Sequence, residues 1–248
     1  MERPGDWNTL PIYKKIQIYG KNLNEDYAKY VNKLEAKKIV KEICGEDIEI
    51  PRVIKIINNI QDGISCQDLN INHIIKSAHG SGWNINISEN TKIEDVIKRL
   101  NSWNMKFNPL NEKQYSYINP TFFIEEKIND SVIGITGDAL VYMIRCIHGN
   151  PISISVKYKK TQNSYDFDWN LKTPTTQTPI GIIIPKPRKL DLMLKLAKKL
   201  SKPFEFVRID FYIGENDLIY FSEFTFTPAA GYQVFDLETE MYQGSLWN

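Results

Sequence analysis

The chain has few of the residues that carry metal and nucleophile chemistry. Its 248 residues include only three cysteines, Cys44, Cys66 and Cys146, which lie far apart and form no C-x-x-C pair. We therefore expect neither a disulfide framework nor a structural zinc site. The three histidines are scattered, and no Ser-His-Asp order or G-x-S-x-G turn is present, so serine-triad hydrolysis is not expected. Sparse, unpaired cysteines favour a reducing cytoplasm.

Long apolar runs and an excess of one charge are also missing. No run approaches the roughly 18 apolar residues of a membrane span, and the start, MERPGDWNTL, has no apolar signal-peptide core, so neither membrane insertion nor export is expected. With 31 basic and 30 acidic residues the net charge is +1, which offers no basic stripe for nucleic acid. A hydrophobic content of 42% is that of a soluble globular chain with one large domain or two small ones.

Helical and strand patterns are interleaved along the chain. Helical spacing of apolar residues predicts helices over Asp26–Cys44, Lys92–Trp103 and Leu190–Leu200. Alternating or short apolar runs joined by turns predict several β-hairpins. The sequence therefore predicts an α+β fold with mainly antiparallel sheets.

Three segments give weaker patterns. Residues 1–24 contain Pro4 and Pro11 and predict an irregular lead-in along the surface. Residues 161–178 are polar and rich in Thr and Pro, which is typical of a long surface loop that carries function or moves. The acidic, aromatic tail after Phe235 is expected to pack back loosely.

The segment Phe206–Gly231, FVRIDFYIGENDLIYFSEFTFTPAAG, places charge inside a predicted strand pair. Period-2 alternation puts Arg208 and Asp210 on one strand face. If the strands pair across the turn, Asp210 and Glu223 point into one small space. Two such carboxylates repel unless they share a proton or a cation, and hard oxygen ligands suit Mg2+ that carries a nucleotide phosphate. The alternative is an ordinary cross-strand ion pair with Glu223 solvated.

Two earlier regions add positive charge and glycine. Lys33 and Lys37 lie one turn apart on the helix Asp26–Cys44, where lysines are ordinarily just solvated. The run INHIIKSAHGSGWNINIS predicts a hairpin whose tip, residues 79–82, can turn backbone N–H groups toward phosphate oxygens, with Lys76 adding a charge. A plain turn is the alternative, and the segment is no P-loop because the G-K-[ST] ending is missing.

Two charged residues stand in otherwise apolar strands. Glu125 lies near the end of the predicted strand Thr121–Ile128, where backbone groups and a carboxylate can meet a purine edge, although charged strand ends are also ordinary. Arg145 lies in the predicted strand Asp138–Ile147. A cation there costs free energy unless it is paired or faces a ligand.

These segments, in this order and spacing, resemble the ATP-grasp proteins. More narrowly, they are similar to the TupA-like branch, which is associated with teichuronopeptide and other surface-polysaccharide genes. The matching text is NKLEAKKIV, IIKSAHGSGWNI, FFIEE, YDFDWN, IPKP and FVRIDFY…IYFSEFTFTPAAG, over about residues 12–235. The resemblance implies two α+β subdomains with mainly antiparallel sheets that grip ATP, and a shortened amino-terminal part.

The resemblance also implies ATP and Mg2+ as cofactors. Asp210 and Glu223 would hold the metal, with Thr225 as a weaker ligand where many relatives have Asn. Arg208 would steady the transferred phosphoryl or acyl oxygen. The residues implied in nucleotide binding are Lys33 (preferred to Lys37), Lys76, His79, Gly80, Ser81, Gly82, Glu125, Glu126, Lys127 and Ile128.

One departure from the branch concerns a strand lysine. The branch often has D-Y-K where this chain has Val141, Tyr142 and Met143. Arg145 is the candidate replacement, and with Lys76 and Arg208 it completes the expected catalytic cations.

The expected organisation is a lead-in and helical part over residues 1–48, a small ATP-grasp subdomain over 49–128 and a large one over 129–248 that carries the metal carboxylates. The leading hypothesis is an ATP-dependent carboxylate-amine ligase, in which the γ-phosphoryl passes to a carboxylate and an amine attacks the acyl phosphate. The resemblance implies a uronic-acid or amino-acid carboxylate in capsule or other surface-polysaccharide biosynthesis. The alternatives are a sugar or glycan kinase and a module that binds nucleotide or glycan without turnover. The substrates and the oligomeric state stay open.

Overall fold

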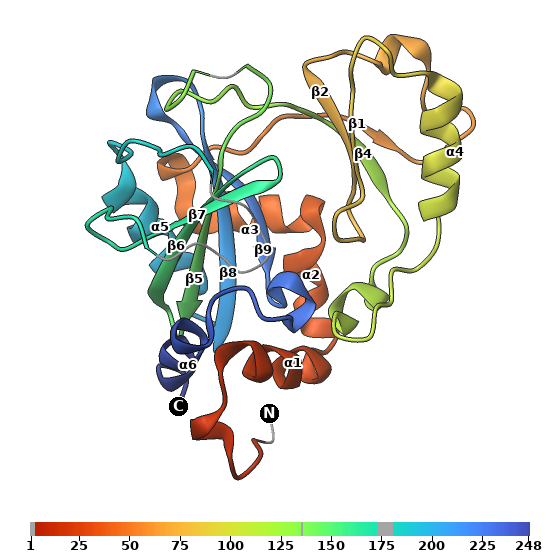
Figure 1. The fold of residues 1–248 in the computed structure, drawn as a ribbon. Helices are drawn as coiled ribbons and strands as arrows, with labels where there is room; N and C mark the ends of the chain where they lie inside the picture. The colour runs from red at the N-terminus through yellow and green to blue at the C-terminus, as the bar shows by residue number, and fades with distance from the viewer. Residues whose placement is uncertain (1–2, 135, 173–180) are drawn as a thin grey trace.

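The computed structural model describes residues 3–134, 136–172 and 181–248. It contains two antiparallel sheets with helices around them (Figure 1), so the expected α+β class is confirmed. The smaller sheet has the order β1-β4-β2-β3, and the larger has β7-β6-β5-β8-β9. The strands are β1 (Val53–Ile57), β2 (His73–Ser77), β3 (Asn84–Asn86), β4 (Phe122–Glu126), β5 (Val141–Ile147), β6 (Asn150–Tyr158), β7 (Thr161–Tyr165), β8 (Phe206–Ile213) and β9 (Ile219–Thr225). The helices are α1 (Ile12–Asn22), α2 (Ala28–Val31), α3 (Lys33–Cys44), α4 (Ile93–Trp103), α5 (Leu190–Ser201) and α6 (Leu237–Ser245).

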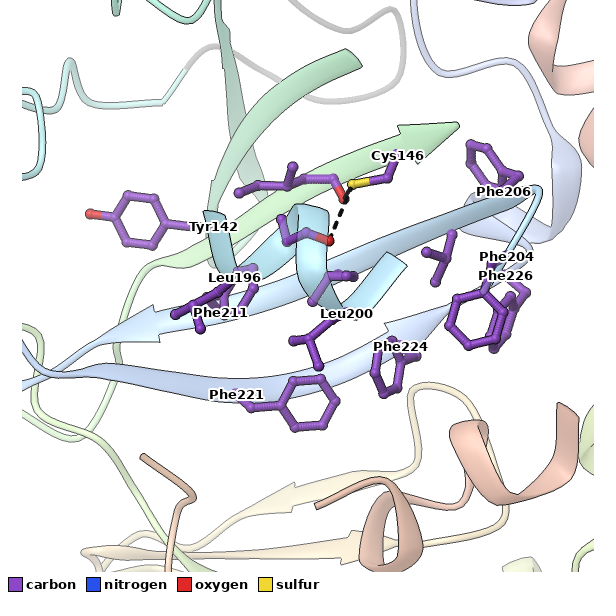
Figure 2. Close-up of a cluster of buried hydrophobic side chains, with 14 of the residues drawn as sticks. Tyr142, Cys146, Leu196, Leu200, Phe204, Phe206, Phe211, Phe221, Phe224 and Phe226 are labelled. Carbon is purple, nitrogen blue, oxygen red and sulfur yellow. Dashed lines mark hydrogen bonds between the residues drawn. The ribbon is translucent and has the colours of Figure 1, made fainter. Parts of the chain in front are cut away.

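The larger sheet has one apolar face and one charged face. Val207, Ile209 and Phe211 are fully buried, and they share a core with Leu196 and Leu200 of α5. Figure 2 shows α5 packed against the strands on this face, with the phenylalanines of β8, β9 and their flanks around it. Because strand side chains alternate, the intervening residues of β8 point to the opposite face. The alternation predicted for this strand is thereby confirmed.

The smaller sheet is covered on its outer side by α4 (Figure 1). Val96 and Leu100 of the helix pack with Ile75 of β2 and Ile124 of β4 in a second apolar core. The helical spacing of Lys92–Trp103 predicted this helix, and β2 pairs with β3 as the predicted hairpin. Lys76, next to Ile75, faces the other side of the sheet.

The residues that cap helix α3 set where it begins and ends. The Asn32 side chain accepts a hydrogen bond from Leu34 N at 3.0 Å and so caps the first turn. Gly45 ends the helix with a φ of 60°, a conformation that glycine adopts without a Cβ penalty. Gly45 therefore terminates α3. Lys33 and Lys37, in the first turns of α3, are both largely buried.

The expectation of an irregular surface lead-in over residues 1–24 is wrong. Residues Ile12–Asn22 form α1, and Ile12 and Ile16 are buried in the larger core. Pro11 directly precedes the helix, where its fixed φ favours initiation rather than disruption. Gly20 lets α1 approach the backbone of Asn111 closely, because a Cβ at this position would lie 2.6 Å from the Asn111 carbonyl oxygen.

The expectation of a loosely packed tail after Phe235 is also wrong. Helix α6 follows, and Trp247 is fully buried, stacked on Phe206 with ring centroids 5.1 Å apart. Trp7 Nε1 donates to the Trp247 carbonyl at 2.8 Å, and buried Lys15 donates to the carbonyls of Gly244 and Trp247 at 2.8 and 2.7 Å. The two ends of the chain consequently lie together (Figure 1).

The predicted surface loop 161–178 begins as the edge strand β7, which pairs with β6, so that part of the prediction is wrong. Because this edge strand of the larger sheet contains polar residues such as Gln162, its sequence resembles that of a loop. Residues 173–178 of this loop lie outside the described residues. In the described ranges, no helix is both long and apolar enough to cross a membrane.

Candidate functional site

A cleft of about 570 Å3 lies between the charged face of the larger sheet and the smaller sheet. Its walls come from alternate positions of consecutive strands, as the pleat requires. From the smaller sheet and its hairpin tip they are Ile74, Lys76, Ser81, Gly82, Asn84 and Asn86. From the larger sheet they include Val141, Met143, Arg145, Ser155, Lys157, Arg208, Asp210, Tyr212, Ser222 and Glu223.

The carboxylates predicted on β8 and β9 come together. Asp210 and Glu223 are direct neighbours across the two strands. Arg208 Nε and Nη2 donate to the two oxygens of Asp210 at 2.7 and 2.6 Å, and Nη2 lies 3.8 Å from Glu223 Oε1. Thr225 Oγ1 accepts from Arg208 Nη2 at 3.2 Å. One guanidinium therefore bridges both carboxylates and the threonine, so the ion pair and the shared-space interpretations of this segment hold together.

The electrostatics of the pair differ between its members. Asp210 is 2% exposed, and burial raises the pKa of its carboxyl to about 6, while Arg208 pulls that pKa down and Glu223 adds to the rise. The Glu223 side chain is 32% exposed and can turn toward solvent or a ligand. The site thus contains one fixed carboxylate and one accessible carboxylate.

Lys33, and not Lys37, reaches this cleft. Lys33 Nζ donates to the Gly80 carbonyl at 2.6 Å and lies 3.9 Å from Glu223 Oε2. Burial lowers the pKa of Lys33, and Glu223 opposes that change. Lys37 instead forms an ion pair with Glu125, with Nζ 2.6 Å from Oε2.

Glu125 is buried between two lysines. Its Oε1 accepts a hydrogen bond from Lys76 Nζ at 2.7 Å, and its Oε2 faces Lys37. Burial raises the pKa of Glu125, but the two lysines outweigh that effect and hold the pKa below its ordinary value. The carboxylate of Glu125 therefore positions Lys76 at the cleft, and joins β4 and β2 to α3.

The hairpin tip divides into an anchor and a cleft wall. The His79 imidazole is fully buried, with Nδ1 accepting from Thr121 N at 3.0 Å and Nε2 lying 3.0 Å from the Trp103 carbonyl. Ser81 and Gly82 line the cleft, and Gly82 has a φ of 71°. His79 thus anchors the loop away from the cleft, while the next residues present backbone to it.

The segment after β4 lines a smaller adjoining cavity of about 150 Å3. Glu126, Lys127 and Ile128 form part of its wall, and it shares Ile74, Lys76 and Tyr212 with the larger cleft. Lys127 Nζ donates to the carbonyls of Ile71 and Ile87 at 2.7 and 2.9 Å, which fixes this segment against the smaller sheet.

Sequence reasoning overlooked Lys157, which lines the cleft from β6 and whose charge lowers the pKa of Asp210. A signal was available in the sequence, because Ser155 and Lys157 alternate with the apolar residues Ile154 and Val156. Met143 stands directly opposite Asp210, at the position where the branch often has lysine. Arg145 lies two residues further along the same face and is 5% exposed.

The donor set suits Mg2+ with phosphate and water ligands. No cluster of three or more His, Cys, Asp or Glu side chains able to hold a metal occurs in residues 3–134, 136–172 and 181–248, so a fully protein-built metal cage is not formed there. Mg2+ commonly takes one or two carboxylates and completes its shell with water and substrate phosphates. Asp210 and Glu223 could provide the carboxylates, and the nearby lysines could hold the phosphates.

The chain matches the family described as TupA-like ATPgrasp over residues 12–247, and it belongs to that family. The resemblance inferred from the motifs is therefore confirmed, as is the ATP-grasp fold. No match was found among curated proteins. Among solved structures, an L-amino acid ligase from Bacillus licheniformis is similar, with 15% identity and a TM-score of 0.50, covering 91% of this chain and 50% of that one.

A D-alanine--D-alanine ligase from Bacillus anthracis is also similar, with 14% identity, a TM-score of 0.48, and coverage of 88% of this chain and 67% of that one. The chain thus spans between half and two thirds of the length of these two ligases. At such identities the likeness concerns the fold.

Proposed function

We propose that this protein is an ATP-dependent carboxylate-amine ligase. The observation that carries the proposal is the pair Asp210 and Glu223 on one wall of a cleft, with Lys33, Lys76 and Lys157 around it. Such cations would hold negative phosphate oxygens, and the two carboxylates would hold a metal ion that supplies further positive charge. Family membership and the ligases of like fold support the same reaction class.

In this proposal the chain's residues act by positioning and charge neutralisation. Lys33 and Lys76 bind phosphate oxygens, and Ser81 and Gly82 cover them with backbone N–H groups. Asp210, Glu223 and Thr225 hold Mg2+, which neutralises charge on the nucleotide when bound. Arg208, released from Asp210 in part, stabilises the oxyanion of the reacting group.

The nucleotide base belongs in the adjoining cavity. Glu126, Lys127 and Ile128 line it, while Glu125 acts indirectly through Lys76. We further propose residues 49–128 as the small subdomain and 129–248 as the large one. Residues 1–48 contribute Lys33, and their helices pack into the core of the larger sheet.

The proposed reaction joins a carboxylate and an amine and consumes ATP. A carboxylate oxygen attacks the γ-phosphorus, ADP leaves, and an amine then displaces phosphate from the acyl carbon with loss of a proton. A uronic-acid or amino-acid carboxylate from surface-polysaccharide or capsule biosynthesis is the proposed acceptor. A cytoplasmic location fits a reaction that consumes ATP.

The test begins with calorimetric titration of Mg2+ and the ATP analogue AMP-PNP. We expect Mg2+-dependent binding to the native chain and its loss in Asp210→Asn/Glu223→Gln. The matched control is Glu215→Gln/Asp217→Asn, which removes two charges from the turn of the same hairpin and should bind as the native chain does. Glu223→Gln alone keeps the Arg208–Asp210 pair and guards against simple misfolding. Equal binding by native protein and the double variant would refute the metal assignment.

Turnover then separates the reaction classes. With ATP, Mg2+, uronates or amino acids and a panel of amines, a ligase forms ADP and an amide only when both partners are present. A phosphorylated sugar without any amine requirement would identify a kinase instead. Tight nucleotide binding without ADP formation across the panel would identify a binding module.

A further inference from the structure

Arg145 lines the cleft and forms no ion pair with a carboxylate of the described residues. Arg145 of β5 stands directly opposite Arg208 of β8, on the same face of the sheet. Like charges opposite each other on neighbouring strands destabilise a sheet. Arg208 is neutralised by Asp210, but among the described residues no carboxylate lies within ion-pair distance of Arg145. A buried cation with this environment needs a counter-ion from elsewhere.

The surroundings of Arg145 orient its guanidinium without a carboxylate of the described residues in ion-pair contact. Nη1 donates to Gln243 Oε1 at 2.9 Å, and the guanidinium carbon lies 4.6 Å from the centroid of the Phe235 ring. Glu240 favours the charged form of Arg145 from a distance, but its Oε1 accepts from the backbone N–H groups of Val234 and Phe235. These contacts hold the Arg145 guanidinium in one orientation on the wall of the cleft.

The charge of Arg145 persists at neutral pH. Burial lowers the pKa of its guanidinium to about 10, with Glu240 opposing and Arg208 adding to the decrease. A guanidinium has five N–H donors, and the described contacts use one of them. Donors are consequently left for an anion in the cleft.

The adjoining wall carries unusual backbone strain. Ala229 and Ala230 both have a φ of 51°, and Gly231 follows with a φ of 75°. A left-handed conformation is unfavourable for alanine and is retained where neighbours impose it. Here Asn111 Nδ2 donates to the Ala230 carbonyl at 3.1 Å, and Gln17 Nε2 donates to the Gly231 carbonyl at 2.9 Å. Strain of this kind concentrates at ligand sites.

We propose that Arg145 binds the carboxylate of the acceptor, and that the end of the cleft formed by Arg145, Pro228, Ala229 and Phe235 is the acceptor subsite. This inference rests on the proposed ligase function and assigns its second substrate a place. The planar fork of a guanidinium matches a carboxylate in a bidentate manner. A single monoanion is enough to neutralise Arg145, whereas the phosphates already have Lys33, Lys76 and Lys157.

A carboxylate and a phosphate both present negative oxygens to a guanidinium, so the γ-phosphate of ATP is the alternative ligand of Arg145. The first arm of the test compares native protein, Arg145→Lys and Arg145→Met by calorimetry with Mg2+ and AMP-PNP. The methionine variant retains an unbranched apolar side chain against Phe235, and circular dichroism and a melting curve verify its fold. We expect affinities within about threefold of native. Because the loss of a hydrogen bond to a charged group weakens binding by tenfold or more, a loss of that size in Arg145→Met would assign the residue to the γ-phosphate and overturn the proposal.

The second arm uses acetate as a probe carboxylate. Protein labelled with 15N at arginine side chains is saturated with Mg2+ and AMP-PNP and titrated with acetate, and the Nε–H resonance missing in Arg145→Met identifies Arg145. We expect a saturable shift of that resonance in native protein, with the Arg208 resonance changing less. No saturable shift, with the melting temperature still lowered in Arg145→Met, would assign Arg145 a structural role and overturn the proposal. If native protein fails to bind AMP-PNP, the proposed function fails, and the same titration without nucleotide still tests Arg145.

Discussion

Glu125→Gln offers a sharp test of how the two sheets are joined. Glu125 is 2% exposed and contacts Lys76 at 2.7 Å and Lys37 at 2.6 Å. Lys37 belongs to α3, which packs in the larger core, while Glu125 and Lys76 belong to the smaller sheet. The substitution keeps the shape of the side chain but leaves two buried ammonium groups without a counter-ion. We therefore expect the largest effect of any single charge removal outside the β8–β9 pair.

The magnitude follows from the burial of both partners. Removing one member of a buried ion pair costs about 3–5 kcal/mol because the remaining charge is uncompensated. For a chain of this size each kcal/mol lowers the melting temperature by about 2–4 °C. We expect Glu125→Gln to lower the midpoint by about 6–20 °C in differential scanning calorimetry at neutral pH.

The neighbouring residue provides a matched control. Glu126 pairs with Arg52 at 3.2 Å, but both side chains are largely exposed, and such surface pairs contribute about 0–1 kcal/mol. Glu126→Gln should therefore change the midpoint by less than about 4 °C. Equal shifts for the two variants, or a shift below about 2 °C for Glu125→Gln, would refute the interpretation of the buried triad as a joint between the sheets.

The same reasoning fixes the pH dependence. The folded-state pKa of Glu125 lies below its ordinary value, which is about 4.3 in an unfolded chain. Its stabilisation is therefore fully present above that value and is lost as the pH falls through the lower folded-state pKa. We expect the difference in midpoint between native protein and Glu125→Gln to be constant from about pH 7 to pH 5 and to narrow below about pH 4.

Three further predictions concern parts of the fold that support the cleft. Lys15→Met should lower stability by about 1–3 kcal/mol in urea unfolding, because the carbonyls of Gly244 and Trp247 lose their buried donor; an unchanged midpoint would contradict this account of the joined termini. Ala230→Gly should raise the unfolding free energy by about 0.5–1 kcal/mol, since relief of the left-handed conformation outweighs the added chain entropy; a loss of stability would show that the Cβ contributes more packing than strain. His79→Leu should speed hydrogen exchange of the Thr121 amide, because Thr121 N loses its acceptor, and unchanged exchange there would rule out an anchoring role.

The sequence predicted the fold best where pattern and packing agree. The alternation of Val207, Ile209 and Phe211 with Arg208 and Asp210 holds in β8, because a sheet with one buried face imposes that period. Helix α1 was missed because Pro4 and Pro11 suggested an irregular segment, whereas Lys15 of this helix is fully buried with its ammonium on backbone carbonyls of Gly244 and Trp247. No local pattern specifies a partner more than 200 residues away.

The site shows the same division. Asp210 and Glu223 could be paired from strand spacing and a turn, which are local features. The partners of Glu125 could not be predicted from the sequence, because Lys37 and Lys76 reach it from different elements. The choice between Lys33 and Lys37 depends on which turn of α3 faces the hairpin tip. That orientation is set by packing against the larger sheet, and periodicity alone does not determine it.

The contacts of Trp7 and Lys15 with Trp247 also constrain how the molecule is made. Closing a loop of this length costs about 5 kcal/mol in chain entropy, so the contact forms only after the rest of the larger core has ordered. At about 5–20 residues per second, the ribosome needs roughly 12–50 s to deliver the partner of α1. During that interval Ile12 and Ile16 lack part of their cover. The nascent chain therefore leaves part of its first helix uncovered until Trp247 has emerged.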